Sequence, residues 1–179
     1  MLFKLIVATT HDNGIGYKNS LPWKIREELK EFAKTTIKNK KNIVVMGKNT
    51  WNSIPNKPLK NRINVIISST LSQENLDINN NSIHIYDSIS DFLNNNIKYK
   101  EIEECWIIGG ERIYKSFLTE HQDLLDEIHI TRIKHDYLCD TYFTEIPESA
   151  TLIQSETAVY HDNSINRNVE VTKEVYSLK

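Results

Sequence analysis

Three segments of this chain combine glycine, hydroxyl or cationic residues in a way that suits a phosphate group. Gly109-Gly110 ends an apolar run before a predicted helix, Met46-Gly47-Lys48 does the same, and Ser68-Ser69-Thr70 ends a third run. Glycine lets the backbone approach a ligand closely, and a helix N-terminus offers free N–H groups to an anion. The alternative for each segment is a tight turn, and none forms the G-x-G-x-x-G dinucleotide fingerprint. Three such segments at one sheet edge would suit an extended anionic ligand such as a dinucleotide.

A carboxylate is the second candidate. On a helical wheel, Glu27 and Glu31 lie on the polar side of a predicted helix, whereas Glu28 borders its apolar stripe beside Phe32. The residues expected to share this buried face are Ile25, Leu29, Phe32, Ala33 and Thr36. A charge run on a helix is usually its solvated face, and that alternative applies to all three glutamates. At the border of the stripe, however, Glu28 could bind a planar, nitrogen-rich ligand held against Phe32.

Other catalytic chemistries have little support in the sequence. The six histidines show no ligand or triad spacing, the chain has no CxxC or HExxH motif, and Ser68 and Ser69 lack a G-x-S-x-G elbow. Cys105 and Cys139 cannot build a disulfide framework, and Cys105 is expected to be a small core side chain. We therefore expect neither a metal site nor a serine hydrolase.

The overall composition excludes several broad classes of protein. Twenty-two basic and 24 acidic side chains give a net charge of −2, and no segment gathers enough Lys or Arg to follow a phosphate backbone. The apolar stretch Leu5–Ala8 is far too short for a membrane span or a signal peptide. We expect a cytoplasmic protein without nucleic-acid or membrane partners, and a monomer because no exposed apolar surface is obvious.

The pattern of apolar residues predicts the elements that must position these groups. Buried strands are expected at residues 2–9, 42–46, 63–68, 83–86, 105–108 and 127–133. Helices are expected at residues 24–36, 49–54, 87–93 and 111–120. Alternating segments at 152–161 and 168–177 predict an antiparallel hairpin. Together they predict an α/β fold: a single domain over residues 1–179, with a mostly parallel twisted sheet of about eight strands flanked by helices. In such sheets, ligands bind at the carboxyl ends of the strands, which here means after Ala8, Met46, Ile67 and Ile108.

In their order and spacing, these motifs resemble dihydrofolate reductase over residues 2–177. The matching segments are residues 6–8, 14–16, 21–23, 46–51, 53–55, 58–64, 106–110, 131–133 and 140–141, together with Glu28 five residues after Trp23. The resemblance implies reduction of 7,8-dihydrofolate to 5,6,7,8-tetrahydrofolate with NADPH, by hydride transfer to C6 and protonation at N5. The product would supply one-carbon metabolism, and antifolates such as methotrexate would bind the same site.

By this resemblance, Glu28 is the acid of the pterin pocket, with Thr131 beside it. Water near Leu21 and Trp23 would deliver the proton to N5, so these four residues form the expected catalytic set. Arg62 would pair with the α-carboxylate of the glutamate tail, a bidentate task that Lys performs poorly. The substrate-binding residues would be Ile6, Val7, Ala8, Glu28, Phe32, Ala33, Ser53, Ile54, Leu59, Arg62, Ile108 and Thr131.

The same resemblance implies an NADPH site and no metal. Gly109 and Gly110 match the cis peptide of the family, and Lys48 and Arg112 argue for NADP over NAD. The cofactor-binding residues would be Ala8, Gly14, Ile15, Gly16, Tyr17, Lys18, Asn19, Ser20, Gly47, Lys48, Asn49, Thr50, Ser68, Ser69, Thr70, Ile108, Gly109, Gly110, Glu111, Arg112, Ile113, Tyr114 and Thr141. The loop from His11 to Pro22 is expected to open and close over the cofactor.

Two positions depart from the pattern of the family. Ala33 stands where many members carry a polar or basic residue that reaches the glutamate tail, so we expect weaker tail binding. Thr70 stands where eukaryotic members often have Arg, which leaves Lys48 and Arg112 more of the charge of the 2′-phosphate.

Two alternatives remain open from the sequence. One is a reductase of the same fold, such as the pyrimidine reductase of riboflavin synthesis, which would need neither Glu28 beside Thr131 nor Arg62 for a tail. The other is a non-catalytic pterin- or nucleotide-binding module, or part of a larger assembly. This domain is fused to thymidylate synthase in some organisms, for which we expect no room in 179 residues.

Overall fold

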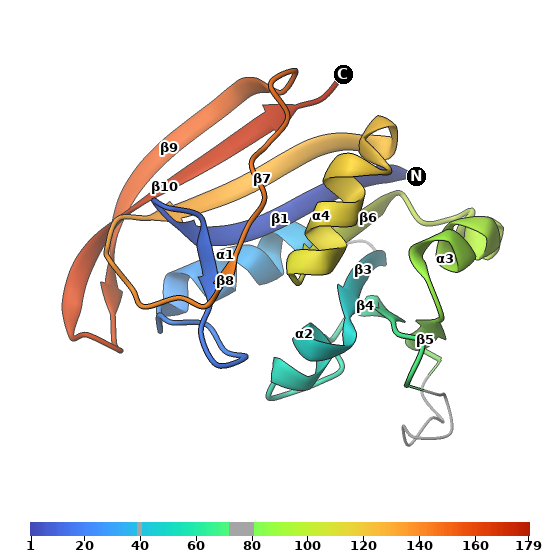
Figure 1. Ribbon diagram of the computed structural model, residues 1–179, viewed down its shortest axis with the longest axis horizontal. Helices are drawn as coiled ribbons and strands as arrows, with labels where there is room; N and C mark the ends of the chain where they lie inside the picture. The colour runs from blue at the N-terminus through green and yellow to red at the C-terminus, as the bar shows by residue number, and fades with distance from the viewer. Residues whose placement is uncertain (39–40, 72–80) are drawn as a thin grey trace.

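The computed structural model describes residues 1–38, 41–71 and 81–179, and an eight-stranded sheet lies at their centre (Figure 1). Its strand order is β5-β4-β3-β6-β1-β7-β10-β9. The strands are β1 (Leu2–Thr10), β3 (Asn42–Gly47), β4 (Arg62–Ile67), β5 (Ile83–Tyr86), β6 (Glu104–Gly109), β7 (Leu125–Ile133), β9 (Thr151–Asp162) and β10 (Arg167–Ser177). Neighbours from β5 to β7 pair in parallel, and β10 pairs antiparallel with β7 and β9. The predicted mostly parallel sheet with a C-terminal antiparallel hairpin is confirmed.

Helices cover both faces of the sheet. They are α1 (Arg26–Ile37), α2 (Lys48–Ser53), α3 (Ile89–Asn95) and α4 (Glu111–Thr119), with short 3₁₀ turns η2 (Asn96–Tyr99) and η3 (Gln122–Leu124). In Figure 1, α4 lies in front of the sheet and α1 behind it. No helix within the described residues is long and apolar enough to cross a membrane.

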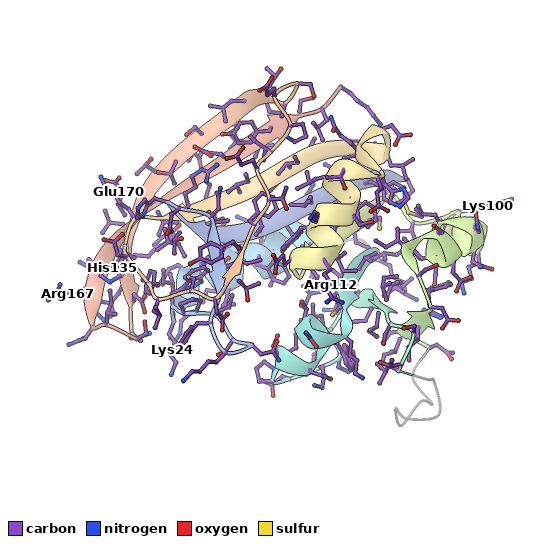
Figure 2. All side chains as sticks on the ribbon, viewed as in Figure 1. Lys24, Lys100, Arg112, His135, Arg167 and Glu170 are labelled. Atoms are coloured by element: carbon purple, nitrogen blue, oxygen red, sulfur yellow. The ribbon has the colours of Figure 1, made fainter. Side chains whose placement is uncertain are left out.

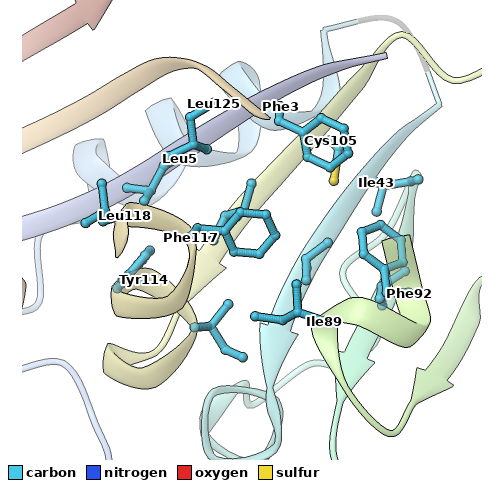
Figure 3. Packing of buried hydrophobic residues seen from close by; sticks show 14 of the residues in the cluster. Phe3, Leu5, Ile43, Ile89, Phe92, Cys105, Tyr114, Phe117, Leu118 and Leu125 are labelled. Carbon is cyan, nitrogen blue, oxygen red and sulfur yellow. The ribbon is translucent and has the colours of Figure 1, made fainter. Parts of the chain in front are cut away.

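Alternation along the central strands builds a core on each face. Leu5, Ile43 and Phe117 belong to the cluster beneath α3 and α4 (Figure 3), whereas Val44 and Trp106 pack on the opposite face. Strands of a parallel sheet are buried on both sides in this way, which explains why they appear in the sequence as continuous apolar runs. Cys105 is completely buried in the first cluster, which confirms its predicted place in the core.

The predicted start of the first helix, at Lys24, is wrong by two residues. The backbone N–H of Lys24 donates to Asp162 Oδ1 at 3.0 Å, and Ile25 forms a β-bridge with Asp162. These contacts with the end of β9 hold residues 24 and 25 extended, so α1 begins only at Arg26. The cause lies some 140 residues away along the chain, where no local pattern could indicate it.

A second, two-stranded sheet was not predicted. It pairs β2 (Gly14–Gly16), which lies within the expected loop from His11 to Pro22, with β8 (Thr141–Tyr142). Strands of three and two residues are too short to produce a recognisable alternation in sequence. This small sheet fastens the loop after β1 to the segment after β7.

The free edge of the main sheet exposes apolar side chains, although no exposed apolar surface was expected. β9 is the last strand in the order, and Leu152, Ile153 and Val159 on it are 49%, 57% and 64% exposed. The sequence did not indicate this exposure, because the alternating pattern of β9 resembles that of a strand with one buried face.

Candidate active site

A cavity of about 810 Å³ opens at the carboxyl edge of the parallel strands, between α1, α2 and the start of α4. This volume lies in the usual range for small-ligand sites. The predicted site residues that line it are Ile6, Val7, Ala8, Ile15, Gly16, Asn19, Ser20, Leu21, Glu28, Phe32, Gly47, Lys48, Asn49, Thr50, Ser53, Ile54, Leu59, Ser68, Ser69, Thr70, Ile108, Gly110, Glu111, Arg112, Ile113, Tyr114 and Thr141. The fold therefore gathers most of the proposed substrate and cofactor residues around one space.

Glu28 lies in the first turn of α1 and lines the cavity, although only 9% of the residue is exposed. Within the described part of the chain, no hydrogen bond or ion pair occupies its carboxylate. Burial raises the pKa of Glu28 to about 7, and the positive charge of Lys173 partly opposes this shift. An unpartnered buried carboxylate is costly, so its place at the wall of a cavity suggests a partner on the ligand.

Glu31 and Leu29, on the same helix α1, have surroundings that differ from those of Glu28. Glu31 turns toward the sheet hairpin, where it pairs with Lys173 Nζ at 3.1 Å. Leu29, expected within the buried stripe of the helix, is instead 53% exposed and lines the cavity. This expectation was wrong because α1 borders the cavity, so part of its apolar face contacts that space rather than the core.

Glycines at the ends of β3 and β6 shape one wall of the cavity. The Gly109–Gly110 peptide is cis, as the resemblance implied, and Gly109 has a φ of +113°. A Cβ on Gly110 would lie 3.2 Å from Thr50 Oγ1, and one on Gly47 would lie 3.3 Å from Ile113 Cγ1. At these two positions glycine therefore allows neighbouring backbone segments to approach closely, while α2 and α4 begin immediately afterwards.

Hydroxyl and cationic groups extend this wall to β4. Lys48 Nζ donates to Thr70 Oγ1 at 3.0 Å. The Ser68 hydroxyl accepts from the backbone N–H groups of Thr70 and Leu71 at 3.2 and 3.1 Å, so it also shapes the turn after the strand. These hydrogen bonds hold Lys48, Ser68 and Thr70 beside one another along the cavity wall.

Tyr114 connects α4 to β1, the strand whose residues Ile6 and Ala8 line the cavity. Its hydroxyl donates to the carbonyl oxygen of Ile6 at 2.8 Å. Burial raises the pKa of Tyr114 far above its ordinary value, and the negative charge of Glu28 adds to this effect. The phenol therefore stays neutral and acts as a fixed hydrogen-bond donor.

Eight predicted site residues do not line the cavity. They are Gly14, Tyr17, Lys18, Trp23, Ala33, Arg62, Gly109 and Thr131. Thr131 pairs with Ala8 across β7 and β1. Arg62 Cζ lies over the ring of Phe32, 5.8 Å from its centroid, and the NH1 group donates to Thr36 Oγ1 at 2.8 Å. Both therefore contact or adjoin residues that do line the cavity.

Trp23 is 2% exposed and packs edge-on against Tyr137, with ring centroids 5.5 Å apart. Its indole Nε1–H has no hydrogen-bond acceptor among the described residues. Buried donors normally have a partner, and a bound water commonly provides it. Trp23 is thus placed to hold water rather than to touch a ligand directly.

Three lining residues were missed by the sequence analysis: Leu29, Ile67 and Asp87. Ile67 is the last residue of β4, and Asp87 directly follows β5. The rule that ligands bind at carboxyl ends of strands could have found Asp87, had it been applied to the short strand at residues 83–86.

Comparison with known proteins agrees with this geometry. A family model described as dihydrofolate reductase matches residues 2–177. The chain is 33% identical over 153 residues to a dihydrofolate reductase of Drosophila melanogaster, covering 82% of this chain and 81% of the relative. It is 38% identical over 154 residues to a dihydrofolate reductase of Schistosoma mansoni, covering 82% and 80%.

Some relatives are longer proteins. A bifunctional dihydrofolate reductase-thymidylate synthase of Paramecium tetraurelia is 33% identical over 164 residues, which cover 92% of this chain but 33% of the relative. The match to the family model spans nearly the whole chain and agrees with the position of the cavity, the glycine-lined strand ends and the buried glutamate. The chain therefore belongs to the dihydrofolate reductase family.

Proposed function

We propose that this protein reduces 7,8-dihydrofolate to 5,6,7,8-tetrahydrofolate, using NADPH as the hydride donor. The observation that supports the proposal is Glu28, a buried carboxylate at the wall of the cavity that has no hydrogen-bond or ion-pair partner among the described residues. A pterin presents a ring N–H and a 2-amino group side by side, and one carboxylate can accept both hydrogen bonds. Two charge-assisted bonds would fix the orientation of the ring and offset the cost of the buried charge.

The raised pKa of Glu28 suits this role in catalysis. With a pKa of about 7, the group exchanges its proton near neutral pH. Bound as a carboxylate, it favours the protonated, more electrophilic imine of the substrate. N5 must gain a proton as hydride reaches C6, and Glu28 favours that step by its charge.

Water near Trp23 is the proposed source of the proton. The Nε1–H of Trp23 has no acceptor within the part of the chain that the structure describes, as expected for a group that binds water. Leu21 is 48% exposed at the cavity wall, where it can limit the access of further solvent. Leu21 and Trp23 thus position one water while excluding bulk solvent from the reacting atoms.

The residues along the strand ends fit a dinucleotide. Gly47 and Gly110 bring the backbone close to the cavity, the N-termini of α2 and α4 open toward it, and Lys48 and Arg112 supply positive charge. NADPH, when bound, supplies the hydride. Ala8 and Ile108, near the ends of β1 and β6, line the cavity and would hold the nicotinamide against the pterin. Hydride transfer requires the two reacting carbon atoms to come within roughly 3–3.5 Å of each other.

Arg62 is proposed to bind the glutamate tail. Its Nε donates to the carbonyl oxygen of Lys60 at 3.1 Å and its NH1 group to Thr36, which leaves part of the guanidinium for a carboxylate. These two hydrogen bonds hold the guanidinium in place over the ring of Phe32. Ala33 has no polar atom to add, so the tail would depend chiefly on Arg62.

The test is the loss of reduced-nicotinamide absorbance with NADPH and dihydrofolate, with and without methotrexate. Methotrexate-sensitive turnover is the expected result. Tight NADPH binding without turnover of dihydrofolate would contradict the proposal. Turnover of the pyrimidine intermediate of riboflavin synthesis would then identify the other reductase, and no turnover of either would indicate a binding module.

A further inference from the structure

Asp87 places a carboxylate at the far end of the cavity wall. It directly follows β5, the outermost parallel strand, and it lines the cavity. The backbone N–H of Ser68 donates to the carbonyl oxygen of Tyr86 at 2.9 Å, so the ends of β4 and β5 are tied together. Asp87 therefore lies beside the hydroxyl-rich segment after β4, at the opposite end of the strand row from Ala8.

The Asp87 side chain has no structural task in the described part of the chain. No hydrogen bond or ion pair occupies its carboxylate there, and the residue is exposed. The N-terminus of α3 is capped by its neighbours, because Ser88 Oγ accepts from the N–H of Asp91 at 3.0 Å. Asp91 Oδ2 in turn accepts from the backbone N–H of Asp87 at 3.4 Å. The free carboxylate is therefore available to a ligand.

The charges at this part of the cavity wall are balanced rather than cationic. Lys48 and Arg112 are opposed by Asp87 and Glu111, which line the same cavity. Figure 2 shows Arg112 between α4 and α2. Lys48 donates to Thr70 and forms no ion pair with Asp87 among the described residues. A site for a 2′-phosphate benefits from an excess of positive charge, whereas here the carboxylates of Asp87 and Glu111 offset the two cations.

We propose that Asp87 is a specificity-determining residue of the cofactor site: its carboxylate repels a 2′-phosphate and accepts a hydrogen bond from a ribose hydroxyl, so that NADH is used alongside NADPH. This inference rests on the proposed function. An acidic side chain that binds the 2′-hydroxyl is the general way in which dinucleotide sites accept NAD, while cations accept the 2′-phosphate of NADP. Here, both kinds of group line one end of the cavity.

Nucleotide fragments test this inference without turnover. Adenosine 5′-monophosphate and adenosine 2′,5′-bisphosphate differ only in the 2′-phosphate, and their Kd values are measured by isothermal titration calorimetry. Asp87→Asn is expected to shift the Kd ratio about fivefold toward the bisphosphate, and Asp87→Lys about tenfold or more, because one or two charges change near a doubly charged group. The shift should shrink in high salt, which screens exposed charges.

Asp123 provides matched controls, because it is an exposed aspartate in η3 that does not line the cavity. Asp123→Asn and Asp123→Lys change the net charge equally and should leave the Kd ratio unchanged. In parallel, the NADPH-to-NADH ratio of kcat/KM should rise in the two Asp87 variants and not in the controls.

The outcomes separate this inference from the proposed function. Binding of both fragments with a Kd ratio that changes less than twofold in both Asp87 variants would overturn the role of Asp87 alone. An equal shift in the Asp123 controls would overturn it too, because the effect would then be one of net charge. Failure of the wild-type protein to bind either fragment would overturn the cofactor site itself.

Discussion

Glu28 combines two properties that oppose each other in a folded protein. It is buried and has no partner among the described residues, and burial raises its pKa to about 7, yet the proposed chemistry needs it as a carboxylate. Its ligand is expected to supply the missing hydrogen bonds. This conflict between stability and activity gives opposite predictions for the same substitution.

For activity, Glu28→Gln is expected to lower kcat at pH 7 by about 100-fold or more, because the amide cannot favour the protonated imine. Lower pH should partly restore turnover, since the substrate then arrives already protonated. The measurement is the pH profile of kcat and kcat/KM for both proteins. Full activity of the variant at pH 7 would contradict the role assigned to Glu28.

For stability, the same variant is expected to be more stable than the wild type in the absence of ligand. A folded pKa raised from 4.5 to about 7 means that wild-type stability falls as the pH rises between these values, by roughly 3 kcal/mol. Glu28→Gln escapes this loss, so the difference in unfolding free energy should grow from pH 4.5 to pH 7. Urea denaturation at pH 5 and pH 8 measures it, and an equal difference at both pH values would contradict the raised pKa.

Arg62 is expected to act on substrate affinity rather than on the chemical step. Arg62→Lys loses the planar guanidinium that lies over Phe32 and could bind a carboxylate in bidentate fashion. We expect KM for dihydrofolate to rise about tenfold, equivalent to about 1.4 kcal/mol, with kcat much less affected. A dihydropterin without the glutamate tail is the control, because the variant and the wild type should reduce it equally well.

At the scale of elements, the segment from β2 to α1 closes one side of the cavity. Its position depends on Asp140, whose Oδ2 accepts from the backbone N–H of Lys18 at 2.9 Å. This bond lowers the pKa of Asp140 below its ordinary value, and a hydrogen bond from the Thr141 hydroxyl adds to the effect. The carboxylate is thus ionised at neutral pH and holds the loop against β8.

Asp140→Ala is therefore expected to loosen the loop without unfolding the protein. Cofactor release should become several times faster, because the lining residues Asn19 and Ser20 lose their anchor. Stopped-flow fluorescence gives the dissociation rate, and thermal melting serves as the check on the fold. An unchanged release rate would show that β2 and β8 alone hold the loop.

At the scale of the whole molecule, a partly buried ionic network lies at the amino ends of the strands, opposite the cavity. Lys4 Nζ lies 3.2 Å from Glu104 Oε1 and 2.9 Å from Glu127 Oε2, and Lys38 Nζ lies 2.9 Å from Glu104 Oε1. Glu104 also accepts from Trp106 Nε1 at 3.1 Å. The network joins β1, β6 and β7 to the C-terminal end of α1, the helix that carries Glu28.

Glu104→Gln is expected to destabilise the fold by about 2–4 kcal/mol, because Lys4 is 6% exposed and would lose one of its two carboxylates. Burial alone would raise the pKa of Glu104, but Lys38 and Lys4 hold it below its ordinary value. Its stabilisation is therefore present above the unfolded pKa and is lost as the pH falls through the lower folded pKa. Chemical denaturation at pH 7 and pH 3 should show a large and a small difference, respectively, with kcat little changed at pH 7.

The sequence alone determined the features that depend on local pattern. Apolar runs and helical periodicity depend on neighbouring residues, so they predicted the strands of the main sheet and its mostly parallel arrangement. The wheel position of Glu28 is equally local, since residues one turn apart share a helix face. The order of motifs was sufficient for the family, because many modest matches in register are jointly specific.

Only the tertiary structure decided how these parts meet. Whether Glu28 has a partner depends on side chains from β10 and α4, which are more than 80 residues away in sequence. Leu29 was expected to be buried but lines the cavity, and Asp87, at the start of a predicted helix, lines it too. The two-stranded sheet of β2 and β8 likewise forms from segments too short to be recognised alone. In each case the deciding contact is long-range, and periodicity carries no information about which distant surface a residue will face.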